Sequence, residues 1–323
     1  MALPRPWRSP RPDGPHPATV ADIAELNEVF SDAFTERYRR DGLVGVRVPF
    51  LNPAIWRYAI ADAAGGALLW RDENEGVAAF NVAHASGTEG WMGPLAVRPD
   101  LQGSGVGKDV VGSAIEWLRR AQCTTIGLET MPRTMDNIGF YSSLGFTPGK
   151  LTVTVTVDGA PAARAPILLG KLGAAAQEDA VAECRALTQG ILPGHDYARE
   201  IRLTEELGLG LTLLLREDDR LTGFALCHTI PLVEGRPLEE VRVLKVVLEE
   251  EKAMPFAIAA LADVARRYHA RRIALRAQTE YGAAYRALVE AGGRVRWTDL
   301  RMTLDGAAER RAERGVVWSN WEV

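Results

Sequence analysis

The order of the expected strands and helices occurs twice in the chain, and this duplication constrains the fold more than any other feature. The segment Leu68–His84 (LLWRDENEGVAAFNVAH) is similar to Leu213–His228 (LLLREDDRLTGFALCH), with one residue of slippage. After each segment, hydrophobic periodicity predicts a strand, a helix, a strand, a helix and a strand at approximately matched spacing. A repeat of this length indicates duplicated domains rather than a solenoid.

Both halves are expected to combine helices with strands and hairpins, which predicts a mixed α/β (α+β) sheet in each. In the first half, the expected helices cover residues 18–38, 53–61, 104–121 and 137–144, and the expected strands cover residues 67–71, 77–83, 91–97, 124–131 and 151–157. In the second half, the strands after the repeated segment cover residues 241–248, 272–278 and 294–304, and the helices cover residues 255–268 and 282–291. The ending GVVWSNWEV is expected to form a final strand.

The length of 323 residues suits two domains. The stretch 158–166 is rich in Gly, Pro and Ala and marks the expected boundary, and the proline-rich start indicates an extended arm. We therefore expect a flexible N-terminal arm over 1–17, one domain over 18–160 and a second over 161–323.

Composition excludes several kinds of partner. The net charge of −4 gives no overall attraction to nucleic acid or to anionic membranes. Apolar runs stay well short of the ~20 residues that a membrane helix needs, and the N-terminus lacks the pattern of a secretory signal. The three cysteines, Cys123, Cys184 and Cys227, have no metal-ligand spacing. We expect a cytoplasmic protein with no nucleic acid partner, no membrane contact and no metal; an oligomer is possible.

The most informative segment is Leu95–Val111 (LAVRPDLQGSGVGKDVV), where an expected strand ends, a tight turn follows and a helix begins. Gly103, Gly105 and Gly107 allow a ligand to approach the backbone of this turn closely. The free N–H groups at the start of the helix and the helix dipole favour an anion. The pattern predicts a pyrophosphate-binding turn.

Two common nucleotide motifs do not fit this turn. A Walker loop would need glycine at Gln102 and Ser or Thr at Asp109, and a dinucleotide fingerprint would need glycine at Lys108. The spacing Gln-x-x-Gly-x-Gly, from Gln102 to Gly107, instead resembles the pyrophosphate-binding loop of the GNAT superfamily, which holds acetyl-CoA.

Two further segments strengthen this resemblance. GPLAVRPD, directly before the turn, looks like the family's fourth strand, and NIGFYSSLGF (Asn137–Phe146) resembles its Asn…Phe-Tyr-x-x-Leu-Gly-Phe segment. Together the matches cover residues 18–157. The resemblance implies an acetyl-CoA-dependent N-acyltransferase, in which a primary amine of a small molecule or peptide attacks the thioester directly. An acyl-CoA-binding sensor without turnover and a protein N-acetyltransferase stay open as alternatives.

The resemblance also implies roles for individual residues. It makes Tyr141 the general acid that protonates the departing thiolate of CoA, and it gives the oxyanion a backbone N–H donor from the fourth strand. The residues it assigns to acetyl-CoA are Leu95, Ala96, Val97, Gln102, Gly103, Ser104, Gly105, Val106, Gly107, Lys108 and Asn137. Two of these keep a second interpretation, because Asn137 could instead cap its helix and Lys108 could lie on a solvated face.

The general base is less well defined, because the expected strand over 91–97 carries no carboxylate. Glu129 is the preferred candidate, since Ile126 and Leu128 place it on the opposite face of its strand. Glu89, for which a surface position is expected, and a water relay are the alternatives.

The second half has lost the motifs of the first. The segment Leu244–Ile258 has no Gln-x-x-Gly-x-Gly, and Glu249–Glu251 would repel a pyrophosphate. Leu288 or Val289 stands where Tyr141 stands in the first half. We expect a degenerate GNAT-like domain that either completes the acceptor pocket or acts as a scaffold.

Overall fold

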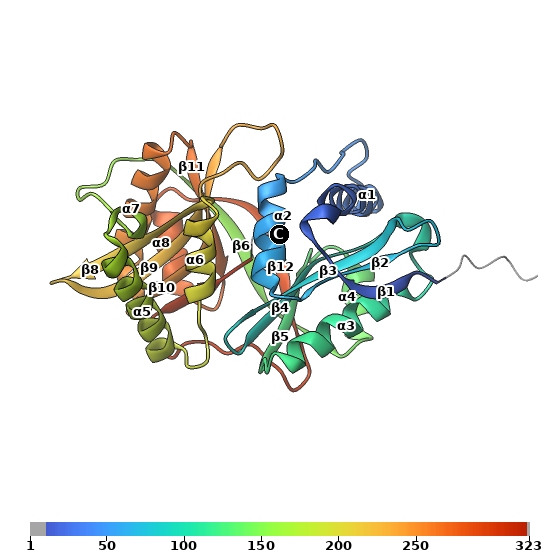
Figure 1. The fold of residues 1–323 in the computed structure, drawn as a ribbon. Coiled ribbons are helices and arrows are strands. Elements are labelled where there is room, and N and C mark those ends of the chain that lie inside the picture. Colours follow the sequence, from blue (N-terminus) through green and yellow to red (C-terminus); the bar gives the residue numbers. More distant parts are fainter. Residues whose placement is uncertain (1–10, 322–323) are drawn as a thin grey trace, which may run out of the picture.

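The computed structural model describes residues 11–321, which fold around one continuous β-sheet (Figure 1). The first half contains β1 (Asp13–Pro17), α1 (Ile23–Arg40), α2 (Pro53–Ala63), β2 (Ala67–Arg71), β3 (Val77–Ser86), β4 (Glu89–Val97), α3 (Val106–Arg120), β5 (Thr125–Thr130), α4 (Met135–Ser142) and β6 (Phe146–Asp158). The second half contains β7 (Ile167–Leu168), α5 (Ala174–Ile191), α6 (Ala198–Glu206), β8 (Gly210–Glu217), β9 (Arg220–His228), β10 (Glu240–Leu248), α7 (Met254–Arg267), β11 (Arg272–Gln278), α8 (Gly282–Glu290), β12 (Arg294–Leu304) and β13 (Val316–Ser319).

The predicted mixed α/β sheet and the duplicated order of elements are confirmed. Differences are concentrated where the sequence pattern is weak. Residues 13–17, assigned to the flexible arm, form β1 and pair with β2, while residues 1–10 of that arm lie outside the described residues. The pattern also gave no indication of α5 and α6, which precede the repeated hairpin of the second half. The domain limits at 18, 160 and 161 stay predictions.

The two halves exchange their last strands. The sheet order is β1-β2-β3-β4-β5-β12-β6-β11-β10-β9-β8-β7, so β12 of the second half lies between β5 and β6 of the first. On its other side, β6 pairs with β11 of the second half. β6 and β12 pair antiparallel and lie near the centre of the molecule (Figure 1). Side chains of β12 are thereby brought beside β5, next to the predicted site.

Strands β4 and β5 separate part of the way along their length. They pair in parallel from Glu89–Met92 to Thr125–Leu128, and the register between β3 and β4 shifts just beyond this point, between Asn81 and Ala83. The shift falls at Gly93–Pro94, where the proline has no N–H to donate to the sheet. The separation leaves an opening in the sheet beside Gly93–Val97.

The equivalent opening in the second half is filled by the chain itself. Strands β10 and β11 pair in parallel only over Glu240–Val243 and Arg272–Leu275. Beyond this point β13 takes over, pairing antiparallel with Lys245–Leu248. Trp318, at the centre of β13, is fully buried.

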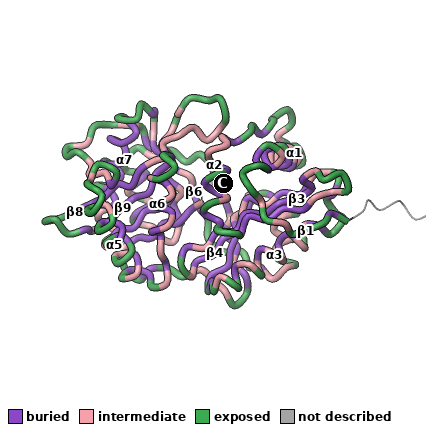
Figure 2. Tube along the Cα trace, viewed as in Figure 1, coloured by how far each residue is buried: buried purple, intermediate pink, exposed green. Residues whose placement is uncertain are grey.

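Helices cover both faces of the sheet, and the buried residues gather within each half, on β3 in the first and on β9 and β10 in the second (Figure 2). In the first half, Trp56 and Phe80 belong to the core beneath α1 and α2, whereas Val111 and Leu128 belong to the core beneath α3 and α4. No helix between residues 11 and 321 combines the length and apolar character needed to cross a bilayer.

Candidate active site

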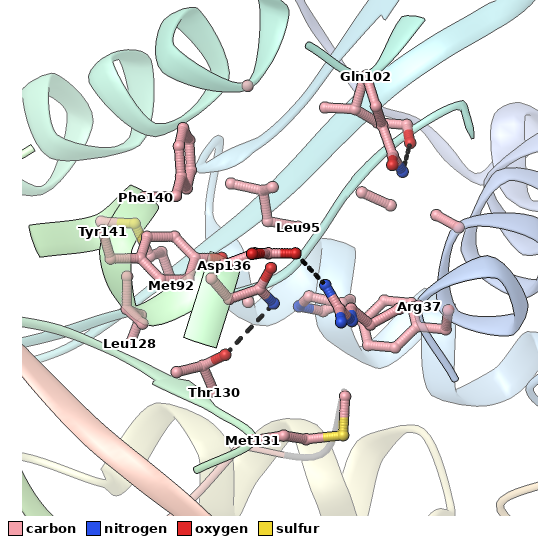
Figure 3. Close-up of a pocket in the computed structure, with 18 of the residues that line it drawn as sticks. Arg37, Met92, Leu95, Gln102, Leu128, Thr130, Met131, Asp136, Phe140 and Tyr141 are labelled. Carbon is pink, nitrogen blue, oxygen red and sulfur yellow. Dashed lines mark hydrogen bonds and ion pairs between the residues drawn. The ribbon is translucent and has the colours of Figure 1, made fainter. Parts of the chain in front are cut away.

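A cavity of about 700 Å³ lies at the opening between β4 and β5. Its walls come from α1, β4, the glycine-rich turn, β5, α4 and one residue of β12 (Figure 3). Leu128 and Tyr141 line it on the α3–α4 side of the sheet, while Glu129 and Asp299 line it on the other side. The cavity thus has walls on both faces of the sheet.

The glycine-rich turn has the backbone geometry of an anion-binding site. Gly103 and Gly105 have φ of +78° and +100°, values that favour glycine, and a Cβ at either position would meet no atom within 4 Å. Helix α3 begins directly after Gly105, so its first N–H groups lie beside the cavity. The Gln102 side chain fixes the turn by donating to the Val97 carbonyl at 3.1 Å, as drawn in Figure 3.

The structure brings the predicted cofactor residues together around this cavity. Its lining includes Leu95, Ala96, Val97, Gln102, Gly103, Ser104, Gly105, Gly107, Lys108 and Asn137. Val106 differs, because its side chain is buried in the core with Val97 and Val110 and anchors the start of α3. Asn137 does not cap α4, because it is the third residue of that helix. Its side-chain amide instead donates to the Thr130 hydroxyl at 3.4 Å (Figure 3).

Tyr141 is half-buried on α4 and lines the cavity beside Phe140, whose ring centre lies 5.2 Å from its own. The side chain packs against the apolar cluster that contains Met92 and Leu128. Removal of the phenol from water raises the pKa of Tyr141 to about 12. The phenol therefore keeps its proton at neutral pH, as a general acid must.

Glu129 lines the cavity, on the strand face opposite Ile126 and Leu128. Both of its oxygens are already engaged: Thr152 and Arg301 donate to Oε1 at 2.5 and 2.7 Å, and Arg276 donates to Oε2. Burial disfavours its ionised form, but the two guanidinium groups outweigh this effect and lower the pKa of Glu129. The carboxylate is well held and a weak base.

The surface position expected for Glu89 is wrong. Glu89 is buried between the two halves, away from the residues that line the cavity. Its carboxylate accepts hydrogen bonds from Trp91 at 2.9 Å, Tyr197 at 3.1 Å and Ser319 at 2.8 Å. These donors and nearby cations account for its burial, and Glu89 joins the halves instead of serving the cavity.

Asp299 on β12 is a lining residue from the second half of the chain, and the sequence analysis did not name it. It pairs with Thr152 on β6, and its carboxylate accepts from Trp297 at 3.0 Å and from Arg276 at 3.1 Å. Burial raises the pKa of Asp299 in spite of these donors. No local motif marks this residue, because its approach to the cavity depends on the strand exchange.

Comparisons with known proteins agree with this geometry. The sequence model of the Acetyltransferase (GNAT) family matches residues 24–146. An uncharacterized N-acetyltransferase from Pyropia yezoensis is 35% identical over 77 residues, which are 24% of this chain and 42% of that protein. The chain thus spans about two fifths of the length of this relative.

Solved structures extend the likeness to both halves. A Pyrococcus horikoshii protein named as an acetyltransferase superposes with a TM-score of 0.66 at 17% identity, over 94% of this chain and 93% of that one. A tandem GNAT protein from the clavulanic acid biosynthesis pathway superposes with a TM-score of 0.58 at 12% identity, over 90% and 96% of the two chains. At these identities the structures show a shared fold. The sequence match places residues 24–146 in the Acetyltransferase (GNAT) family, and the chain as a whole has the fold of a tandem GNAT protein.

Proposed function

We propose that this protein is an N-acetyltransferase that transfers the acetyl group of acetyl-CoA to a primary amine of a small molecule or peptide. The observation that carries the proposal is one continuous cavity that joins an anion-binding turn, a separated pair of strands and a protonated phenol. Each part suits one part of the reaction: the turn suits the pyrophosphate, the opening suits the pantetheine arm, and Tyr141 suits the departing thiolate.

Direct attack of the amine fits this arrangement, because the two faces of the sheet offer separate approaches. Acetyl-CoA would lie along Gln102–Lys108 with its thioester near Leu95–Val97, whose backbone N–H groups are the oxyanion donors that we expect. The amine would arrive from the side of Glu129 and Asp299. A covalent acyl-enzyme has no role in this scheme, and neither does a metal.

Calorimetric titration of acetyl-CoA into the full-length chain tests the cofactor part of the proposal. We expect one binding site per chain, because β13 fills the second opening. In Gly105→Asp the new carboxylate would repel the pyrophosphate, so binding should be lost. Gly235→Asp is the matched control: Gly235 also has a positive φ, of +69°, a Cβ there would meet no atom within 4 Å, and it lies on an exposed loop.

Turnover is then measured as release of the CoA thiol in a screen of primary amines. Acetylation of an amine, lost in Gly105→Asp and kept in Gly235→Asp, would support the enzyme. Tight binding of acetyl-CoA without turnover of any small amine or peptide would favour the acyl-CoA sensor. Absence of acetyl-CoA binding by the wild-type protein would refute the proposed cofactor.

A further inference from the structure

Asp299 reaches the cavity from the second half of the chain. The strand exchange places β12 directly beside β5, where Arg301 pairs with Glu129 and Leu300 pairs with Thr130. Asp299, two residues before Arg301, lies on the same face of the sheet as Glu129, and the two carboxylates share Arg276 as a donor. The acceptor side of the cavity is therefore built partly by the second half.

We propose that Asp299 binds the ammonium group of the acceptor and removes its proton before the amine attacks. This inference rests on the proposed function and adds to it the residue that selects a cationic amine. It also gives the degenerate second half a direct part in the reaction.

Asp299 suits this role better than the other carboxylates that line the described cavity. Glu129 already accepts three hydrogen bonds from Thr152, Arg301 and Arg276. Asp136 has a side chain that is 81% exposed, and it forms an ion pair with Arg37 at 3.6 Å (Figure 3).

The carboxylate of Asp299 keeps capacity for a further donor. It accepts one hydrogen bond at each oxygen, so a lone pair remains on each for an ammonium group. Its side chain is 12% exposed, which allows contact with a molecule in the cavity while excluding bulk water. Burial favours the protonated form and so makes Asp299 a stronger base than a carboxylate in water.

Several charged and titratable groups face Asp299 from the elements packed around it. Arg276 on β11 favours its ionised form, whereas Glu129 on β5 disfavours it. Tyr38 on α1 lies close enough that the charge of Asp299 contributes to raising the pKa of the phenol. Arg133, in the turn before α4, lies 5.9 Å from the centre of the Trp297 ring. Of these influences on Asp299, burial is the largest, so its pKa stays raised although Arg276 lies beside it.

The proton balance follows from these assignments. The acceptor ammonium transfers one proton to the Asp299 carboxylate, and the amine nitrogen then attacks the thioester carbon. As the C–S bond breaks, the sulfur takes the Tyr141 proton. The nitrogen loses its second proton, which restores the phenol through solvent, and Asp299 releases its proton to water. The products are the amide, CoA thiol and one proton in solution.

Two isosteric amines separate this role from a structural one. Ethylamine is an ammonium ion at neutral pH, whereas methoxyamine is already uncharged and needs no base before attack. With saturating acetyl-CoA, Asp299→Asn should lower kcat/KM for ethylamine at neutral pH by about 10²-fold, the scale of a lost general base. It should change kcat/KM for methoxyamine little. The deficit with ethylamine should shrink as rising pH supplies free amine.

Control variants and the wild-type protein complete the test. Asp305→Asn changes an exposed aspartate just beyond β12, which accepts from Thr147 at 2.7 Å, and should behave as wild type with both amines. Asp299→Glu keeps a carboxylate and should recover part of the ethylamine rate. Should Asp299→Asn lose its cooperative melting transition, the wild-type protein decides: kcat/KM for ethylamine should stay level where Asp299 is ionised and fall only in more acidic solution, whereas without a base it would follow the fraction of free ethylamine throughout.

Either no loss in Asp299→Asn or an equal loss with the two amines would overturn the role of Asp299. A wild-type kcat/KM for ethylamine that follows the fraction of free amine throughout the neutral range would do the same. If wild type binds acetyl-CoA but acetylates neither amine nor any other acceptor in the screen, the proposed enzyme fails and this inference fails with it. Calorimetry with acetyl-CoA distinguishes the two failures. If Asp299→Asn still binds acetyl-CoA, a change in its rate concerns the acceptor side and not the proposed cofactor.

Discussion

Replacement of Tyr141 by phenylalanine removes a single hydroxyl from the wall of the cavity and leaves the ring that packs against Phe140 and Phe146. Without a proton donor the CoA thiolate must leave as an anion in a partly apolar site. Loss of a general acid lowers rates by about 10²- to 10⁴-fold. We expect kcat of Tyr141→Phe to fall by about 10²-fold, the lower end of this range, since water at the open side of the cavity can supply part of the proton.

The pH dependence gives a sharper expectation. With the pKa of Tyr141 raised to about 12, roughly one phenol in a thousand is ionised at pH ~9. An unperturbed phenol with a pKa of about 10 would be ionised in roughly one molecule of ten at the same pH. Because the raised pKa keeps the proton in place, Tyr141 should cause no loss of kcat between neutral pH and pH ~10.

The assay is CoA release with a saturating amine over this pH range, with acetyl-CoA binding measured in parallel. Tyr285→Phe is a matched control, since Tyr285 lies half-buried on α8, the counterpart of α4 in the second half. Equal kcat for Tyr141→Phe and wild type would refute the general-acid role. If the wild-type kcat falls as the pH is raised from neutral to ~9, and Tyr141→Phe shows no such fall, the raised pKa would be refuted.

Two further predictions concern stability, and both are measured by thermal and urea unfolding. In Gly127→Ala the new Cβ would lie 2.6 Å from the Trp91 ring, whose centre is 3.8 Å from the Arg301 guanidinium carbon. This overpacking should lower the free energy of unfolding by about 1–3 kcal/mol. The control Gly112→Ala lies on a helix, where its Cβ would meet no atom within 4 Å, and should not destabilise the protein. An unchanged midpoint for Gly127→Ala would show that Trp91 moves freely. Arg301→Met should cost about 3–5 kcal/mol, because it leaves Glu129 and Glu309 without their shared cation, while Arg296→Met on the exposed side of β12 should cost far less. Equal losses in these two arginine variants would contradict the importance of the buried network.

The sequence was most informative where the chemistry depends on neighbouring residues. The turn at Gln102–Lys108 and the segment around Tyr141 are local patterns, and the structure places both on the cavity. The periodicity of apolar residues likewise predicted the helix at 104–121 to within a few residues of α3. In each case the backbone needs of the motif are met within one strand, turn or helix.

Long-range partners explain what the sequence could not indicate. Glu129 was the preferred candidate for the general base, but the two arginines that engage its carboxylate lie 147 and 172 residues further along the chain. Asp299 had no motif, and Glu89 was expected at the surface because the second half that buries it could not be placed. Residues 13–17 pair with a strand more than fifty residues away, which the composition of a proline-rich start cannot show.

In the second half, protein fills the positions that correspond to the cavity of the first half. Its strands separate as those of the first half do, but β13 occupies the gap and Leu288 is fully buried on α8, in the helix that corresponds to α4. Protein core therefore occupies both positions. Strand β12 differs from β13, because it completes the sheet of the first half between β5 and β6. A residue on β12 could therefore come to serve the surviving cavity, and Asp299 is the residue that faces it.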